Sequence, residues 1–128
     1  AVFSKIEIGR FSGAVHVDGD GNDDVIRIYL ETLDQQGRML PVAAKAVVRA
    51  VQIGEEDEQP RLVVEKEYTA EEFDASYRSN MTGKHYTLEV GLPVDMGEDV
   101  DELTVKVSVT QVSTGVKFSE QKSFELTR

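Results

Sequence analysis

Hydrophobic and polar side chains alternate over most of this chain, with a period of two residues that is typical of half-buried β-strands. The clearest run is 103–109, where a leucine and three valines alternate with threonine, lysine and serine. Similar runs predict further strands near residues 6–8, 25–33, 46–53, 62–65, 85–92 and 116–126. About seven strands separated by glycine-containing turns predict an all-β fold. We expect a two-layer antiparallel sandwich of the immunoglobulin-like or fibronectin-like type.

The same alternation predicts the hydrophobic core. Within 46–53 it places Val47, Val51 and Ile53 on one face, with Arg49 between two of them. The core residues expected from all the runs are Ile26, Ile28, Leu30, Val47, Val51, Leu88, Val90, Val105, Val107 and Val109.

One segment has the pattern of a helix rather than a strand. The sequence Thr69-Ala70-Glu71-Glu72 fits a capping box, in which the threonine caps the helix and the second glutamate reaches back to it. Phe73 and Tyr77 follow at a spacing of four, so both can face the sandwich. We therefore expect a helix of about two turns over 70–77.

Composition narrows the range of partners. The chain has 128 residues, with 14 basic and 24 acidic side chains and a net charge of −10. Such a field repels phosphate backbones, so we expect no nucleic-acid partner. No apolar run approaches the roughly 20 residues of a membrane-spanning helix, so we expect no membrane insertion. The length fits one domain over 1–128. Because the chain begins without methionine, we expect it to be excised from a longer protein.

The sequence carries no recognisable catalytic motif. Cysteine is absent, which excludes disulfides and thiol nucleophiles. His16 and His85 are far apart, and neither has a histidine or cysteine neighbour at metal-ligand spacing. No nucleophile elbow, phosphate loop or zinc-protease helix occurs. We therefore do not expect an enzyme.

One loop is dense in oxygen ligands and is the candidate metal site. Calcium takes six to eight oxygen ligands from a flexible loop, and two glycines relax this segment. Its first three ligand positions match an EF-hand loop, but the glycine and the final glutamate of that motif are replaced by Asp23 and Tyr29. The segment is either a calcium loop on a β scaffold or a solvated turn. The candidate ligands are Asp18, Asp20, Asn22, Asp23 and Asp24.

The expected strand order strengthens the case for a cation site near this loop. If consecutive strands run up and down, the loops 10–24, 54–61 and 93–102 lie at one pole of the sandwich. They hold 13 of the 24 acidic residues. Crowded carboxylates repel one another unless solvent or a cation screens them. We expect Asp99 or Asp101 to help bind the cation.

Three segments resemble a family of uncharacterised planctomycete proteins. The stretch 12–26 is similar to that family's Gly-x-x-x-Asp-x-Asp-Gly loop and following strand, 33–42 to its Asp-x-x-Gly-Arg-Leu hairpin, and 68–72 to its helix start. The resemblance covers roughly 12 to 110, and the chain departs from the pattern at Asn22 and in the acidic loop 54–60. It implies an exported or envelope-associated accessory domain and no activity.

These observations favour a non-enzymatic binding or interaction module, calcium-assisted and with a protein as its partner. Sandwich domains offer polar loops and open sheet edges to partners. The alternative is a structural spacer in a larger envelope or secreted protein. Carbohydrate binding is disfavoured because tryptophan is absent and only four tyrosines remain as platforms.

Overall fold

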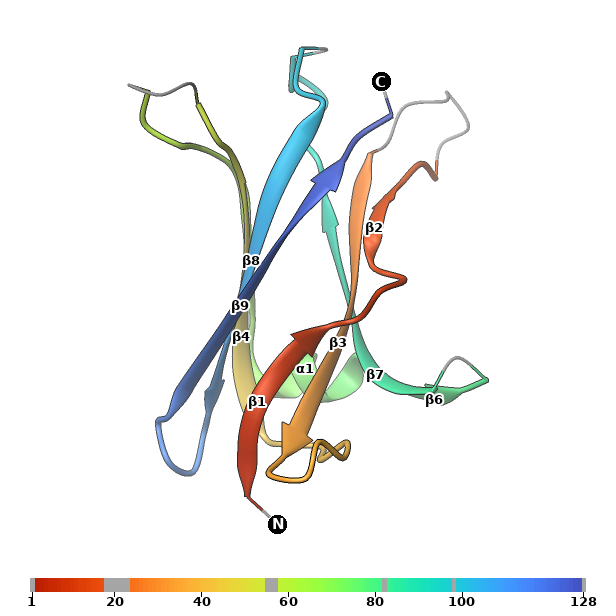
Figure 1. The fold of residues 1–128 in the computed structure, drawn as a ribbon, viewed down its shortest axis with the longest axis vertical. Helices are drawn as coiled ribbons and strands as arrows, with labels where there is room; N and C mark the ends of the chain where they lie inside the picture. Colours follow the sequence, from red (N-terminus) through yellow and green to blue (C-terminus); the bar gives the residue numbers. More distant parts are fainter. Residues whose placement is uncertain (1, 18–23, 55–57, 82, 98, 128) are drawn as a thin grey trace.

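Two antiparallel sheets pack face to face in the computed structural model, which describes residues 2–17, 24–54, 58–81, 83–97 and 99–127 (Figure 1). The first sheet has the order β1-β3-β7-β6, and β2 also pairs with β3. Its strands are β1 (Phe3–Ile8), β2 (Gly13–Val15), β3 (Val25–Asp34), β6 (Tyr77–Asn80) and β7 (Gly83–Gly91).

The second sheet has the order β5-β4-β8-β9. Its strands are β4 (Ala44–Gln52), β5 (Arg61–Tyr68), β8 (Glu102–Gln111) and β9 (Lys117–Glu125). If β2 is left out and β5 is lettered C′, the two sheets correspond to the A-B-E-D and C′-C-F-G sheets of immunoglobulin-like domains. The predicted immunoglobulin-like sandwich is confirmed. It contains two short strands, β2 and β6, that the alternation pattern did not predict.

The core lies between the two sheets, where β3 and β7 face β8. Ile26, Leu88 and Val107 are among its fully buried residues. Eight of the ten residues expected in the core are buried, namely Ile26, Ile28, Leu30, Leu88, Val90, Val105, Val107 and Val109.

The other two predicted core residues, Val47 and Val51, lie on the wrong face. In β4 the buried residues are Ala44, Ala46, Val48 and Ala50, so Val47 and Val51 belong to the outer face and are only partly buried. Side chains two apart along a strand share a face, and the exposed Arg49 lies between the two valines. A charged arginine is rarely buried without a partner, so its position identifies the solvent face.

The predicted helix is α1 (Ala70–Ala75), and its capping box is present. Thr69 Oγ1 accepts the backbone N–H of Glu72 at 3.1 Å, and Glu72 Oε1 accepts that of Thr69 at 3.0 Å. The helix ends two residues earlier than expected because Ser76 caps it and Tyr77 begins β6. Phe73 is the residue of α1 that is fully buried.

The two ends of the described chain lie at opposite ends of the long axis, with Thr127 at the pole that holds the 93–101 loop (Figure 1). Leu92 N–H donates to Asp24 O at 2.8 Å, and Leu126 N–H donates to Asp101 O at 2.7 Å. The described parts of the loops 10–24 and 93–102 therefore meet at one pole, as the strand order predicted. No helix within the described ranges has the length and apolar character needed to cross a membrane.

Candidate functional site

A cleft of about 830 Å³ opens on the outer face of the first sheet. Its floor comes from β1, β3 and β7. The turn after β1 forms one side of the cleft, and the start of β7 forms a second. Met39, from the β3–β4 connection, forms a third. Ligand-binding clefts in proteins are typically of this size. The cleft is therefore the candidate binding site in the described part of the chain.

The aromatic part of the cleft floor is the packed ring pair of Tyr29 and His85. Their rings meet edge to face, with centroids 4.8 Å apart. His85 is 5% exposed, and its Nδ1 lies 3.1 Å from Thr87 Oγ1 on the same strand. An aromatic pair held in this way gives a ligand a fixed surface to contact.

The turn after β1 is fastened to the backbone of Tyr29. Gly9 N–H donates to Tyr29 O at 2.7 Å, and Tyr29 N–H donates to Ser12 Oγ at 2.8 Å. A Cβ atom at position 9 would lie 3.0 Å from Tyr29 O, so this close approach favours glycine. The turn carries Arg10 and Phe11 at the cleft. Phe11 is 67% exposed, and the Arg10 guanidinium lies 4.9 Å from its ring centroid.

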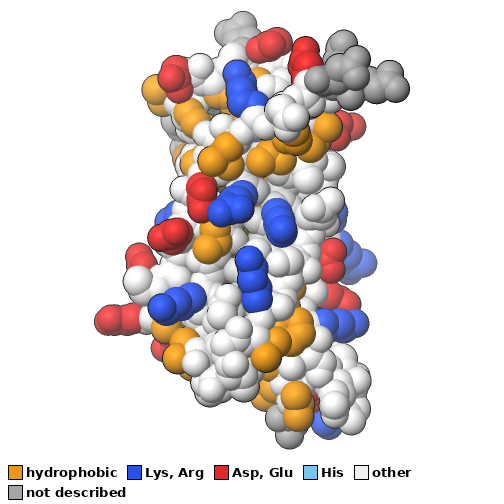
Figure 2. Space-filling model, turned by 90° about the vertical axis from the view of Figure 1, so that its left-hand side faces the viewer, with side chains coloured by type: hydrophobic (Ala, Val, Ile, Leu, Met, Phe, Trp, Pro, Cys, Tyr) orange, Lys and Arg blue, Asp and Glu red, His pale blue; other side chains and the backbone are white. Residues whose placement is uncertain are grey.

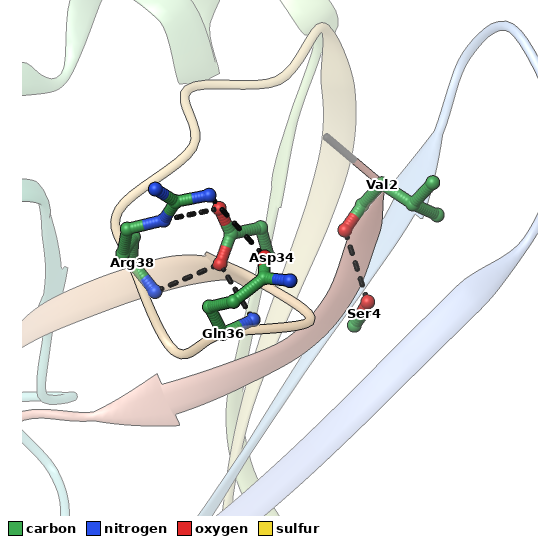
Figure 3. A network of polar contacts seen from close by, with 5 residues as sticks. All are labelled: Val2, Ser4, Asp34, Gln36 and Arg38. Carbon is green, nitrogen blue, oxygen red and sulfur yellow. Dashed lines mark hydrogen bonds and ion pairs between the residues drawn. The ribbon is translucent and has the colours of Figure 1, made fainter.

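Another side of the cleft is held by a carboxylate-centred turn (Figure 3). Asp34 Oδ1 accepts the backbone N–H groups of Gln36 and Arg38, both at 2.9 Å, and Arg38 Nε lies 3.1 Å from Asp34 Oδ2. The hydrogen bond from the Arg38 backbone N–H is the main cause that holds the pKa of Asp34 below its ordinary value. The hydrogen bond from Gln36 N–H and the Arg38 guanidinium lower that pKa further. Gly37 provides the positive φ of 77° that the turn needs. The turn brings Met39 back to pair with Leu33 beside the cleft.

Charges of both signs line the cleft. Glu7 of β1 lies directly opposite Glu31 of β3 in the ladder, so their Cβ atoms are about 4.5–5.5 Å apart. Lys5 Nζ lies 3.0 Å from Glu7 Oε1. Arg10 and Lys84 are also among the lining residues. The cleft can therefore receive a ligand that carries a cationic group beside apolar surface.

The predicted calcium loop falls mostly outside the described residues, because Asp18, Asp20, Asn22 and Asp23 are not among them. Asp24 is described, and its Oδ1 accepts the backbone N–H of Val17 at 3.0 Å, which closes the base of the loop. Within the described ranges, no three acidic or histidine residues are grouped closely enough to hold a metal ion. The calcium site therefore stays a prediction. Of the two histidines, His85 lines the cleft and His16 is exposed.

The cleft was not found by sequence reasoning, because its residues come from separate segments. Phe11, in the polar stretch Gly9-Arg10-Phe11-Ser12, was the one available signal. An aromatic residue in a short polar turn has no core face to join, so its exposure could have been inferred.

No protein-family model, curated protein or solved structure matches the chain. The function must therefore be argued from the cleft itself.

Proposed function

We propose that this domain is a non-enzymatic binding module whose cleft takes up a basic, partly apolar segment of a protein partner. The observation that carries the proposal is the pair Glu7 and Glu31, opposed across neighbouring strands within the cleft. Like charges directly opposite destabilise a sheet. Lys5 Nζ, 3.0 Å from Glu7 Oε1, offsets part of this repulsion. A lysine or arginine side chain of the partner, placed over both carboxylates, would relieve the rest.

The apolar lining supports a peptide-like ligand rather than a bare cation. Phe11, Tyr29 and Met39 all line the cleft, and Phe11 is largely exposed. Aromatic residues that become buried on association supply much of the binding free energy at protein interfaces. An apolar residue next to the partner's cation would cover the Phe11 ring.

The net charge of −10 favours the same class of partner. A negative field raises the association rate of a basic segment and lowers that of an acidic one. Arg10 and Lys84 line the cleft as well. They can pair with backbone carbonyls or a carboxylate of the partner, which would fix the direction of the bound segment.

The proposal is tested with two short capped peptides of equal length, one alternating lysine with phenylalanine and the other alternating glutamate with phenylalanine. Amide signals of the ¹⁵N-labelled protein are followed by NMR during titration. We expect the lysine peptide to shift the signals of Gly9, Tyr29 and His85 in a saturable manner. The glutamate peptide should leave them in place.

A matched pair of double variants locates the effect. Glu7→Gln with Glu31→Gln removes the opposed carboxylates of the cleft, and we expect about tenfold weaker binding of the lysine peptide. Glu102→Gln with Glu125→Gln removes an equally opposed pair on the second sheet and should change nothing. Equal weakening in both variants would mean attraction by net charge alone and would refute the cleft as the site.

A spacer function is the second candidate, and the position of the chain ends favours it. Val2 and Thr127 lie toward opposite ends of the long axis (Figure 1). Neighbouring domains joined at these ends would be held apart by the length of the sandwich. A tandem repeat of this domain should then give an extended particle by small-angle scattering, whereas a folded-back, compact particle would argue against it.

A further inference from the structure

The outer face of the second sheet carries a cluster of basic side chains, although the chain as a whole is acidic. Figure 2 shows Lys and Arg side chains gathered over the middle of this face. Four of them, Lys45, Arg49, Lys106 and Lys117, surround a hollow of about 110 Å³. Among the described residues that line the hollow, none is acidic.

Strand pairing forces two of these cations together. Arg49 of β4 lies directly opposite Lys106 of β8, and like charges in this position repel. Arg49 also reaches the margin of the face, where its Nη2 lies 3.4 Å from Glu65 Oε1. An anion in the hollow would relieve the repulsion between Arg49 and Lys106.

Hydroxyl groups accompany the cations. Ser108 and Thr110 of β8 line the hollow. Ser108 Oγ lies 3.0 Å from Ser119 Oγ of β9, so the hydroxyls form part of a cross-strand ladder. A hydroxyl can donate one hydrogen bond and accept others. Ammonium, guanidinium and hydroxyl donors together are a typical environment for a sulfate or phosphate group.

We propose that this hollow is a binding site for a compact tetrahedral oxyanion, either free phosphate or sulfate or the corresponding monoester of a sugar. The hollow has room for about three or four water molecules, which suits one such group. A long polyanion would extend beyond the four cations into the field of a chain with net charge −10. Screening over about 8 Å at physiological salt lets the local cluster act on a compact anion alone.

The first experiment titrates the ¹⁵N-labelled protein with inorganic phosphate, with sulfate and with acetate at matched ionic strength. We expect phosphate and sulfate to shift the amide signals of Val47, Ser108 and Thr110 in a saturable manner, and acetate to have a much weaker effect. An equal response to acetate, or no saturable shift at all, would overturn the proposal.

Paired variants then test two of the four cations. Lys45→Gln with Lys106→Gln should weaken phosphate binding about tenfold. Arg61→Gln with Lys122→Gln removes the same charge from exposed positions outside the hollow and should leave binding unchanged. Equal weakening by the control pair would overturn the site.

Glucose 6-phosphate distinguishes the two sources of the anion. Tighter binding than inorganic phosphate would identify a sugar monoester as the ligand, and equal or weaker binding would identify the free anion. None of the substituted residues lines the cleft on the first sheet. A failure here would therefore leave the peptide proposal unaffected.

Discussion

The ring of Phe73 on α1 stacks on the ring of Tyr86 on β7, with centroids 4.0 Å apart and planes inclined by 15°. Tyr77 meets the same tyrosine edge-on at 5.4 Å. The Tyr86 hydroxyl accepts the backbone N–H of Val42 at 3.1 Å and donates to the Val42 carbonyl at 3.3 Å. One tyrosine thus joins the helix, the first sheet and the segment that leads into β4.

Phe73→Ala should destabilise the domain by about 3–5 kcal/mol, because it leaves a cavity beside Tyr86 in a fully buried position. Chemical denaturation followed by circular dichroism measures the loss. Phe11→Ala is the matched control, since that ring is exposed, and it should change the unfolding free energy by less than about 0.5 kcal/mol. Equal losses would contradict the assignment of Phe73 to the core.

Val107→Asp should cost about 4 kcal/mol or more, or prevent folding, because it places a carboxylate at a fully buried position. Val47→Asp should be tolerated within about 1 kcal/mol, since the new carboxylate would line the basic hollow. The melting temperatures of the two variants compare the buried face of the second sheet, at Val107, with its outer face, at Val47. A more damaging Val47→Asp would mean that β4 is turned the other way.

Asp34 should give the domain a pH-dependent stability below about pH 4. Its pKa is lower in the folded protein than the ordinary 3.8. The turn is therefore fully stabilised above that value, and the stabilisation is lost as pH falls through the lowered pKa. In Asp34→Asn the amide oxygen can still accept the two backbone N–H groups, but the ion pair with Arg38 is gone.

The measurement is the unfolding free energy in urea at several pH values. The difference between the wild type and Asp34→Asn should be largest near neutral pH and should shrink in acid. Asp95→Asn, at an exposed position, should follow the wild type throughout. A constant difference across the pH range would contradict the proposed role of the carboxylate charge.

The calcium prediction is tested by thermal melts. Extracellular modules bind calcium at about 10⁻⁴–10⁻³ M. A ligand at about 100 times its dissociation constant stabilises a fold by about 2.7 kcal/mol. About 10 mM calcium is about 100 times a dissociation constant of about 10⁻⁴ M, so it should raise the melting temperature by several degrees relative to chelator. Asp20→Ala should remove the shift while Asp95→Ala keeps it. An equal shift with magnesium would indicate screening instead.

Most of the fold was predictable because β8 alternates cleanly between valines and polar residues, and because Thr69 and Glu72 form a local cap. The face of β4 was mispredicted because two of its three valines, Val47 and Val51, lie on the outer face. Its inner row is mainly alanine. Small residues there leave room for α1, which packs on this strand, and for the buried ring of Phe73.

The cleft was beyond the reach of local patterns. The pairing of Glu7 with Glu31 depends on the register between β1 and β3, which a one-residue slip would abolish. The turn that presents Met39 is local, because the hydrogen bonds of Asp34 reach only Gln36 and Arg38. Its position beside Tyr29 and His85, however, depends on how β3 and β7 pair. By contrast, the candidate calcium ligands are contiguous in sequence, so the sequence alone sufficed to propose them.

The opposite placement of the two chain ends also determines how the domain would respond to mechanical load. A pull on Val2 and Thr127 runs nearly along the strands of both sheets (Figure 1). The nine paired positions between β8 and β9 would then be sheared together rather than opened one after another. Because shearing requires many hydrogen bonds to fail at once, the sandwich should resist tension along its long axis far better than tension across its sheets.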